Sequence, residues 1–220
     1  MEKEVFTKIL KKYHLSKTVE QACLEIKGKN LNINFSSPNK DLVGFLKTTI
    51  DLEDGEIGIY TTSQLLSLIN ITEGELALSY YERGNIITKL NINDSNFKLS
   101  FSLSEPLLID KVSTVNEPPK PISTVQLDDT FIGNYLKAKK AIGEEFRVII
   151  TFTYVDSVKV MRFILGGNSE YTNKIQFDVA CEFEDSIYDD YNYNGDYINS
   201  ILSNNKDVNS LHLSVWDEGM

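Results

Sequence analysis

The chain has 220 residues, of which 41% are hydrophobic, and a formal net charge of −10 at pH 7. This apolar content is enough to build one or two domain cores, which excludes an intrinsically disordered chain. No run approaches the roughly 18 apolar residues of a membrane-spanning helix, and the charged N-terminus lacks the apolar segment of a signal peptide. Cys23 and Cys181 stand far apart without metal-ligand spacing, which predicts two free, buried thiols in a reducing cytoplasm and no metal or other cofactor.

The first half of the chain contains two predicted helices among short strands. Apolar residues spaced by three and four predict an amphipathic helix over 4–13, with lysines on its other side. Residues 64–69 predict a second, uncharged helix, for which Thr61, Thr62 and Ser63 are candidate N-caps. Period-two alternation predicts strands at 22–27, 31–35, 43–50, 56–60, 75–81, 85–92 and 96–103.

Prolines then mark a change in character. Pro106, Pro118, Pro119 and Pro121 are four of the five prolines in the chain. Proline removes backbone donors and extends the chain, so we predict a stiff linker at 106–123. The linker separates a first domain, residues 1–105, from a second domain, residues 124–220.

The second half repeats the order of the first. Asp128, Asp129 and Thr130 offer a cap for a basic helix at 131–142, and an uncharged amphipathic segment follows at 197–203. Predicted strands lie at 146–154, 158–165, 174–184 and 211–216. Both halves therefore run basic helix, strands, uncharged helix, strands, which predicts an α+β fold of two similar domains. The second half has one strand after its uncharged helix where the first has three, a deficit of about twenty residues.

The positive charge is concentrated in the two basic helices. Residues 1–17 hold five lysines and two glutamates, net +3, and residues 131–147 hold net +2, so the remaining residues hold −15. Lysine is a flexible point charge that binds phosphate without reading bases. We therefore predict a sequence-independent DNA-binding surface formed by Lys3, Lys8, Lys11, Lys12, Lys137, Lys139 and Lys140.

Motifs of catalysis or metal binding are weak. Asp190, Asn192, Asn194 and Gly195 match half of a calcium loop, but Ile201 stands where a bidentate carboxylate is required. The two histidines belong to no catalytic motif. We therefore predict that the protein is not an enzyme. Two alternatives stay open: a β-rich phage accessory or structural binding protein without activity, and a hydrolase that uses Asp189, Asp190 and Asp196.

Three stretches together resemble the sliding clamps of T-even-type bacteriophages, relatives of the eukaryotic and archaeal clamps. They are Ile57–Tyr60 leading into Gln64–Ile69, the proline-rich Pro118–Ile122, and Ser210–Trp216, a late strand ending in tryptophan. The order of elements matches over almost the whole chain. The sequence departs from the family in lacking a further hairpin after the tryptophan.

The resemblance implies a DNA-clamp fold with two helices per domain on an antiparallel β-sheet layer, and assembly into a homotrimeric ring. The implied function is to encircle double-stranded DNA during DNA replication as a DNA polymerase processivity factor, in the cytoplasm of an infected bacterium and with no membrane contact. The implied partners are a clamp loader and the C-terminal peptide of the polymerase. The candidate partner groove near the linker contains Leu42, Val43, Leu107, Leu108, Ile109 and Trp216.

Overall fold

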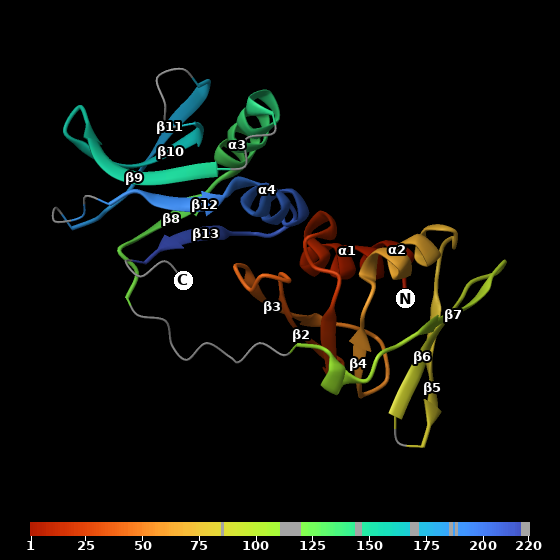
Figure 1. The fold of residues 1–220 in the computed structure, drawn as a ribbon. Coiled ribbons are helices and arrows are strands. Elements are labelled where there is room, and N and C mark those ends of the chain that lie inside the picture. The colour runs from red at the N-terminus through yellow and green to blue at the C-terminus, as the bar shows by residue number, and fades with distance from the viewer. Residues whose placement is uncertain are drawn as a thin grey trace. The chain divides into compact units, whose positions relative to one another are not determined.

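The computed structural model describes residues 1–84, 86–110, 120–143, 147–167, 172–184, 187 and 189–216. The chain divides into two compact units, Met1–Thr114 and Val115–Met220, and each is described by itself (Figure 1). Both consist of helices and antiparallel sheets, which confirms the predicted α+β class. Pro118 and Pro119 of the predicted linker, Phe146 of a predicted strand and residues 217–220 lie outside the described residues. Within the described part of the chain, no helix has the length and apolar character needed to cross a membrane.

Unit 1 contains every element predicted for it, with some ends shifted. Its elements are α1 (Lys3–His14), η1 (Leu15–Lys17), β1 (Ala22–Lys27), β2 (Asn30–Ser36), β3 (Val43–Thr49), β4 (Gly55–Ile59), α2 (Thr62–Asn70), β5 (Ala77–Arg83), β6 (Ile86–Asn93), β7 (Lys98–Ser102) and η2 (Pro106–Leu108). One antiparallel sheet has the order β3-β2-β1-β4, and the other has the order β5-β6-β7. Gly28 and Lys29 form the hairpin turn between β1 and β2, both with positive φ, as a tight two-residue turn requires.

Unit 2 confirms the predicted helices and adds two strands that were not predicted. Its elements are β8 (Ser123–Leu127), α3 (Asp129–Ile142), β9 (Arg147–Val155), β10 (Val158–Gly166), β11 (Lys174–Ala180), β12 (Tyr191–Asn194), α4 (Gly195–Asn204) and β13 (Leu211–Val215). The strand predicted over 174–184 ends at Ala180. The predicted cap of α3 is Asp128, whose carboxylate accepts a hydrogen bond of 2.7 Å from the Phe131 N–H. The unpredicted strands are β8 and β12, which are only five and four residues long.

The two units repeat the same sheet. The order β11-β10-β9-β12 in unit 2 corresponds strand by strand to β3-β2-β1-β4 in unit 1, with the second helix of each unit following the last strand. The second sheets differ, because unit 1 has three strands after α2 whereas the described part of unit 2 has β13 after α4, paired with β8. The internal repeat predicted from the sequence is therefore present in the fold.

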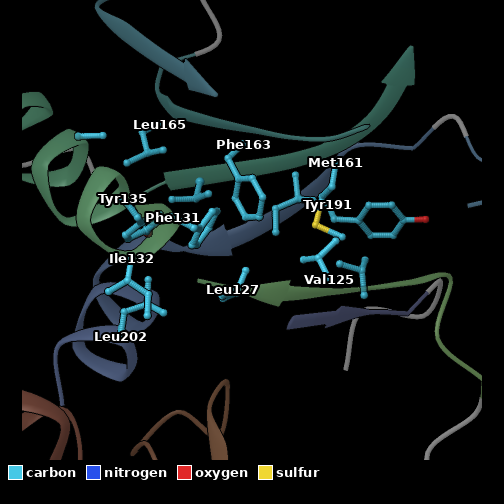
Figure 2. Close-up of a cluster of buried hydrophobic side chains, with 14 of the residues drawn as sticks. Val125, Leu127, Phe131, Ile132, Tyr135, Met161, Phe163, Leu165, Tyr191 and Leu202 are labelled. Carbon is cyan, nitrogen blue, oxygen red and sulfur yellow. The ribbon is translucent and has the colours of Figure 1, made fainter. Parts of the chain in front are cut away.

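The core of unit 2 lies between α3, α4 and the two sheets. Figure 2 shows Phe131 and Tyr135 of α3 on the side of Phe163 and Leu165 of β10, and Ile132 beside Leu202 of α4. The rings of Phe131 and Phe163 pack edge to face with 4.9 Å between their centroids, which is a favourable aromatic geometry. Burial of this stripe of α3 on the sheet fixes which side of the helix meets solvent.

A buried tyrosine joins the two helices in each unit. In unit 1 the Tyr13 hydroxyl lies 2.8 Å from the Thr62 hydroxyl, at the first residue of α2. Because the Thr62 hydroxyl donates to the Glu20 carbonyl at 2.9 Å, Tyr13 must be the donor. In unit 2 the Tyr135 hydroxyl donates to the carbonyl of Gly195, the first residue of α4, at 3.1 Å. Burial raises the pKa of both phenols, so both remain protonated donors at neutral pH.

The Tyr13→Phe variant should lose the hydrogen bond that joins α1 to α2 while keeping the buried ring. We expect the free energy of unfolding to fall by about 1–2 kcal/mol, because the Thr62 oxygen loses a buried donor. Urea unfolding monitored by circular dichroism measures this change. Tyr60→Phe is the matched control, since Tyr60 is 57% exposed, and it should shift stability by less than about 0.5 kcal/mol. Equal effects of the two substitutions would contradict the assigned role of Tyr13.

Candidate functional site

Two of the predicted DNA-binding lysines on α1 are exposed. Phe6, Ile9 and Leu10 bury one side of the helix, and Lys8 and Lys11 lie in solvent on the other side. No charged residue occurs in α2, and its exposed positions include Gln64 and Ser67. The helix pair of unit 1 therefore exposes lysines from α1 and uncharged polar groups from α2.

The other two lysines of α1 are less available to a phosphate. The Lys3 ammonium donates to the carbonyl of Asn70 at 3.0 Å and to that of Thr72 at 2.5 Å, at the C-terminal end of α2. A cation at this position satisfies the last carbonyls of a helix and complements its dipole. Lys12 is half-buried and also has an interaction partner. Lys3 and Lys12 are therefore less exposed than Lys8 and Lys11, and their contact with DNA stays a prediction.

On α3, the lysines separate into an exposed pair and a buried one. Lys137 and Lys140 are exposed, but Lys139 is only 8% exposed. Its ammonium forms an ion pair of 2.8 Å with Asp196 and donates to the Gly143 carbonyl at 3.2 Å. The sequence pattern predicted that Lys139 lies off the buried face of α3. This is wrong, because the first turn of α4 packs beside Lys139 and brings the Asp196 carboxylate to its ammonium.

Four lysines on the first helices of the two units thus remain open to a ligand. These exposed lysines are Lys8 and Lys11 of unit 1 and Lys137 and Lys140 of unit 2. Each pair lies opposite the buried stripe of its helix. The arrangement offers mobile positive charge with no fixed fork for base reading, which suits a polyanion backbone.

A second candidate surface lies on unit 1, where the segment after β7 crosses β4. Ser104 forms an isolated bridge with Gly58, and a Cβ at residue 58 would come within 2.7 Å of the Ser104 carbonyl oxygen. Glycine at this position therefore allows the segment to lie flat on the sheet. Ile109 is buried beneath it at 4% exposure, whereas Leu107 and Leu108 are 89% and 71% exposed.

The turn before β3 lies beside the segment that follows β7. Lys40 and Asp110 form an exposed ion pair of 3.7 Å, which brings the turn of residues 37–42 beside the end of η2. Val43 and Phe45 on β3 are 41% and 42% exposed. We define the partner patch as Val43, Phe45, Leu107 and Leu108.

Of the predicted groove residues, Val43, Leu107 and Leu108 are exposed on unit 1. Leu42 is half-buried, Ile109 lies in the interior, and Trp216 belongs to unit 2, where it is partly buried and has an interaction partner. Phe45, which the sequence did not single out, is exposed on the same side of β3 as Val43, because residues two positions apart on a strand lie on one face.

Three side chains in unit 1 have the composition of a catalytic triad. His14 Nε2 lies 3.0 Å from the Ser63 hydroxyl and 3.3 Å from the Glu20 carboxylate. A serine–histidine–carboxylate triad uses both ring nitrogens, one for serine and one for the acid, whereas here a single nitrogen faces both groups. The cluster instead caps α2, because Glu20 accepts a 2.8 Å hydrogen bond from the Ser63 N–H. This distant carboxylate replaces the local hydroxyl cap that was predicted, and Thr61 makes no side-chain capping bond.

The acidic residues of unit 2 form neither of the sites weighed from the sequence. Residues 191–194 are the strand β12 and Gly195 begins α4, with Asn194 as its N-cap, so the half-match to a calcium loop does not wrap an ion. Asp189 and Asp190 are exposed, and Asp196 is paired with Lys139.

One group within the described residues has metal-ligand atoms close together. Cys23, Glu25 and Glu56 of β1 and β4 each offer one such atom, all within 4.8 Å of one another. The Cys23 thiol already donates to Glu56 at 3.2 Å, and carboxylates gather on protein surfaces without a metal. Neither cysteine forms a disulfide, as predicted, although Cys181 is only half-buried.

Comparison with known proteins identifies the fold. No protein-family model matches the sequence, and no curated protein matches it. The solved structures that match include the PCNA2–PCNA3 complex from Sulfolobus tokodaii, with a TM-score of 0.63, 13% identity, and coverage of 99% of this chain and 88% of that chain. They also include PCNA of A. fulgidus bound to the C-terminal region of FEN-1, with a TM-score of 0.64, 14% identity, and coverage of 98% and 86%. The chain has the DNA-clamp fold.

The Glu20→Gln variant should lose the charged cap of α2 at neutral pH. Burial alone raises the pKa of Glu20, but hydrogen bonds from Ser63 and from His14 outweigh it, so the pKa lies below its ordinary value. A carboxyl with a lowered folded pKa contributes stability above its unfolded pKa and loses it as pH falls through the folded value. Because the side chain is 35% exposed, we expect a loss of only about 1 kcal/mol at pH 7, shrinking toward pH 3.

Urea unfolding at a series of pH values measures this difference, and Glu82→Gln, at an exposed position, is the control. A destabilisation that stays constant between pH 7 and pH 3 would show that the charge of Glu20 has no part in the cap.

Proposed function

We propose that this chain is one protomer of a ring-shaped sliding clamp that encircles duplex DNA. The observation that carries the proposal is the pair of exposed lysines on the first helix of each of two similar units, in a protein with net charge −10 and the DNA-clamp fold. A repeated unit supplies equivalent basic helices at regular intervals around a closed ring. Three copies of a two-unit chain would give six such helices.

The distribution of charge along the sequence favours encirclement of DNA over binding of DNA to the outer surface. Outside the two basic segments the sequence holds a net −15, which disfavours contact between DNA and the outer surface. Topological linkage keeps a ring on DNA even when each phosphate contact is weak. Lysines on the inner surface then offset the repulsion between DNA and the acidic protein. Uncharged groups such as Gln64 and Ser67 add no further attraction that would slow sliding.

The replication role and the assembly are parts of the same proposal. A homotrimer of the T-even bacteriophage type, loaded by a clamp loader, would act as a DNA polymerase processivity factor and would need no catalytic residue. The PCNA2–PCNA3 structure is a complex of two such proteins, which supports assembly of this fold into multimers. The candidate triad also lacks the geometry of a catalytic site.

A partner peptide completes the proposal. In the A. fulgidus structure, PCNA is bound to the C-terminal region of FEN-1. By analogy, we assign the partner patch as the site that receives the C-terminal peptide of the polymerase. Leu107 and Leu108 are the most exposed large apolar side chains among the described residues, and an apolar anchor would cover them.

Reversing the charge of the exposed lysines should weaken retention on DNA without unfolding the protein. For Lys8→Glu, Lys11→Glu, Lys137→Glu and Lys140→Glu together, we expect retention on nicked circular DNA to fall by about tenfold or more, because phosphate contacts become repulsive. Gel filtration of protein–DNA mixtures measures retention, and the wild type should be lost from linearised DNA. Equal retention of the wild type on nicked circular and linear DNA would contradict encirclement.

Charge reversal elsewhere provides the control. Lys47, Lys98, Lys174 and Lys206 are exposed outside the four helices, so their reversal changes the net charge equally. We expect this variant to keep more retention than the helix variant. The same loss in both would assign the effect to net charge and not to the first helices.

Replacing the apolar side chains of η2 should weaken peptide docking alone. For Leu107→Ser with Leu108→Ser, we expect affinity for the polymerase C-terminal peptide to fall by about tenfold, because two exposed anchors are lost. Isothermal titration calorimetry measures the affinity. The control replaces Val158 and Val208, which are 51% and 39% exposed and lie outside the patch. Unchanged affinity in the η2 variant would place the peptide elsewhere.

A further inference from the structure

Unit 2 has a pocket that the proposed function does not use. Its volume is about 780 Å³, within the range of ligand-binding pockets, and it is open to solvent. One wall is residues 120–124, at the start of β8. The other contains five residues between β11 and β12, namely Glu182, Phe183, Glu184, Ile187 and Asp189. None of these residues belongs to the partner patch or to the exposed lysines.

The rim of the pocket is acidic. Glu182, Glu184 and Asp189 line it and are exposed, and Lys120 is the one cation among the described lining residues. Three carboxylates near one another in a concave surface reinforce each other's negative potential. A cationic ligand is therefore favoured over a neutral or anionic one.

The floor of the pocket is apolar. Phe183 and Ile122 supply the apolar surface. Ser123 is 4% exposed and its hydroxyl lies beneath this surface, so it offers no polar group to a ligand. An apolar side chain of a ligand is therefore favoured at the floor.

The walls are held in place by the core and by the second sheet. The Phe183 ring packs on the Phe152 ring, with 5.2 Å between the ring centroids. The Phe183 carbonyl accepts a 2.6 Å hydrogen bond from the Lys159 ammonium. On the other side, the Ile122 N–H donates to the Val215 carbonyl at 2.8 Å. A pocket fixed on two sides before binding loses little entropy when a ligand enters.

We propose that this pocket binds a basic peptide segment in which lysine or arginine alternates with an apolar residue. The carboxylates pair with the cations, and Phe183 and Ile122 receive the apolar side chain. The sequence that follows Trp216 begins with Asp217 and Glu218, so its charge argues against self-occupation. This inference does not depend on the proposed clamp function, because it needs neither DNA nor a ring.

Fluorescence anisotropy with a labelled eight-residue peptide of alternating lysine and leucine tests the proposal in the absence of DNA. For Glu182→Gln with Glu184→Gln and Asp189→Asn, we expect about tenfold weaker binding, because three charge pairs at the rim are lost. The control is Glu4→Gln with Glu53→Gln and Glu82→Gln, three exposed positions of unit 1 that change the net charge equally. Circular dichroism confirms that each variant is folded.

The outcomes separate the possibilities. Binding that the control weakens as much as the pocket variant would reduce the effect to general attraction by an acidic protein and overturn the proposal. Binding that neither variant weakens would overturn it as well. A peptide with serine in place of leucine should bind more weakly, and equal binding would contradict the apolar floor. A peptide with glutamate in place of lysine should not bind, and its binding would contradict the acidic rim.

Discussion

Burial of one apolar stripe of the first helix against its sheet is the constraint on which the rest of each unit depends. In unit 2 the stripe includes Phe131 and Tyr135, and in unit 1 it includes Phe6 and Tyr13. Once the stripe is buried, the helix can no longer rotate about its axis. The burial therefore determines which lysines of the helix face solvent. The buried tyrosine then positions the second helix by its first residue, Thr62 or Gly195. Packing therefore fixes which lysines of the first helix meet solvent and buries Lys139.

The sequence predicted the fold more completely than the site. Periodicity located the four helices and most strands, because alternating burial leaves a direct mark on residue type. It missed β8 and β12, since four or five residues beside a proline-rich linker or an acidic, tyrosine-rich stretch carry too little pattern. It also placed Lys139 off the buried face, where the structure buries it, and it did not predict the contacts of Lys3. A helical pattern shows which side of a helix is polar, but not that a neighbouring helix brings carbonyl groups or Asp196 to that side.

Lys3 and Lys139 show how positive charge divides between structural contacts and the exposed surface. Lys3 closes the C-terminal end of α2, and Lys139 bridges the end of α3 to the start of α4. Both join the two helices of their unit, by different contacts at different ends. Counting basic residues on a helix thus overstates the charge that a ligand meets, and here the difference is between seven lysines predicted and four exposed.

The crossing at Gly58 has a consequence for how such a chain can diverge. The segment from Ser104 to Ile109 lies on β4 because residue 58 has no side chain, and a Cβ there would also come within 3.1 Å of Ile109. A larger residue at 58 is admissible only if the crossing segment withdraws. Because the contact with residue 104 is made by its backbone and that with residue 109 by its side chain, positions 58 and 109 should covary as a pair. Among clamp-fold proteins that share only 13–14% of their residues with this chain, such a coupled pair offers a reference for aligning sequences whose other positions have drifted apart.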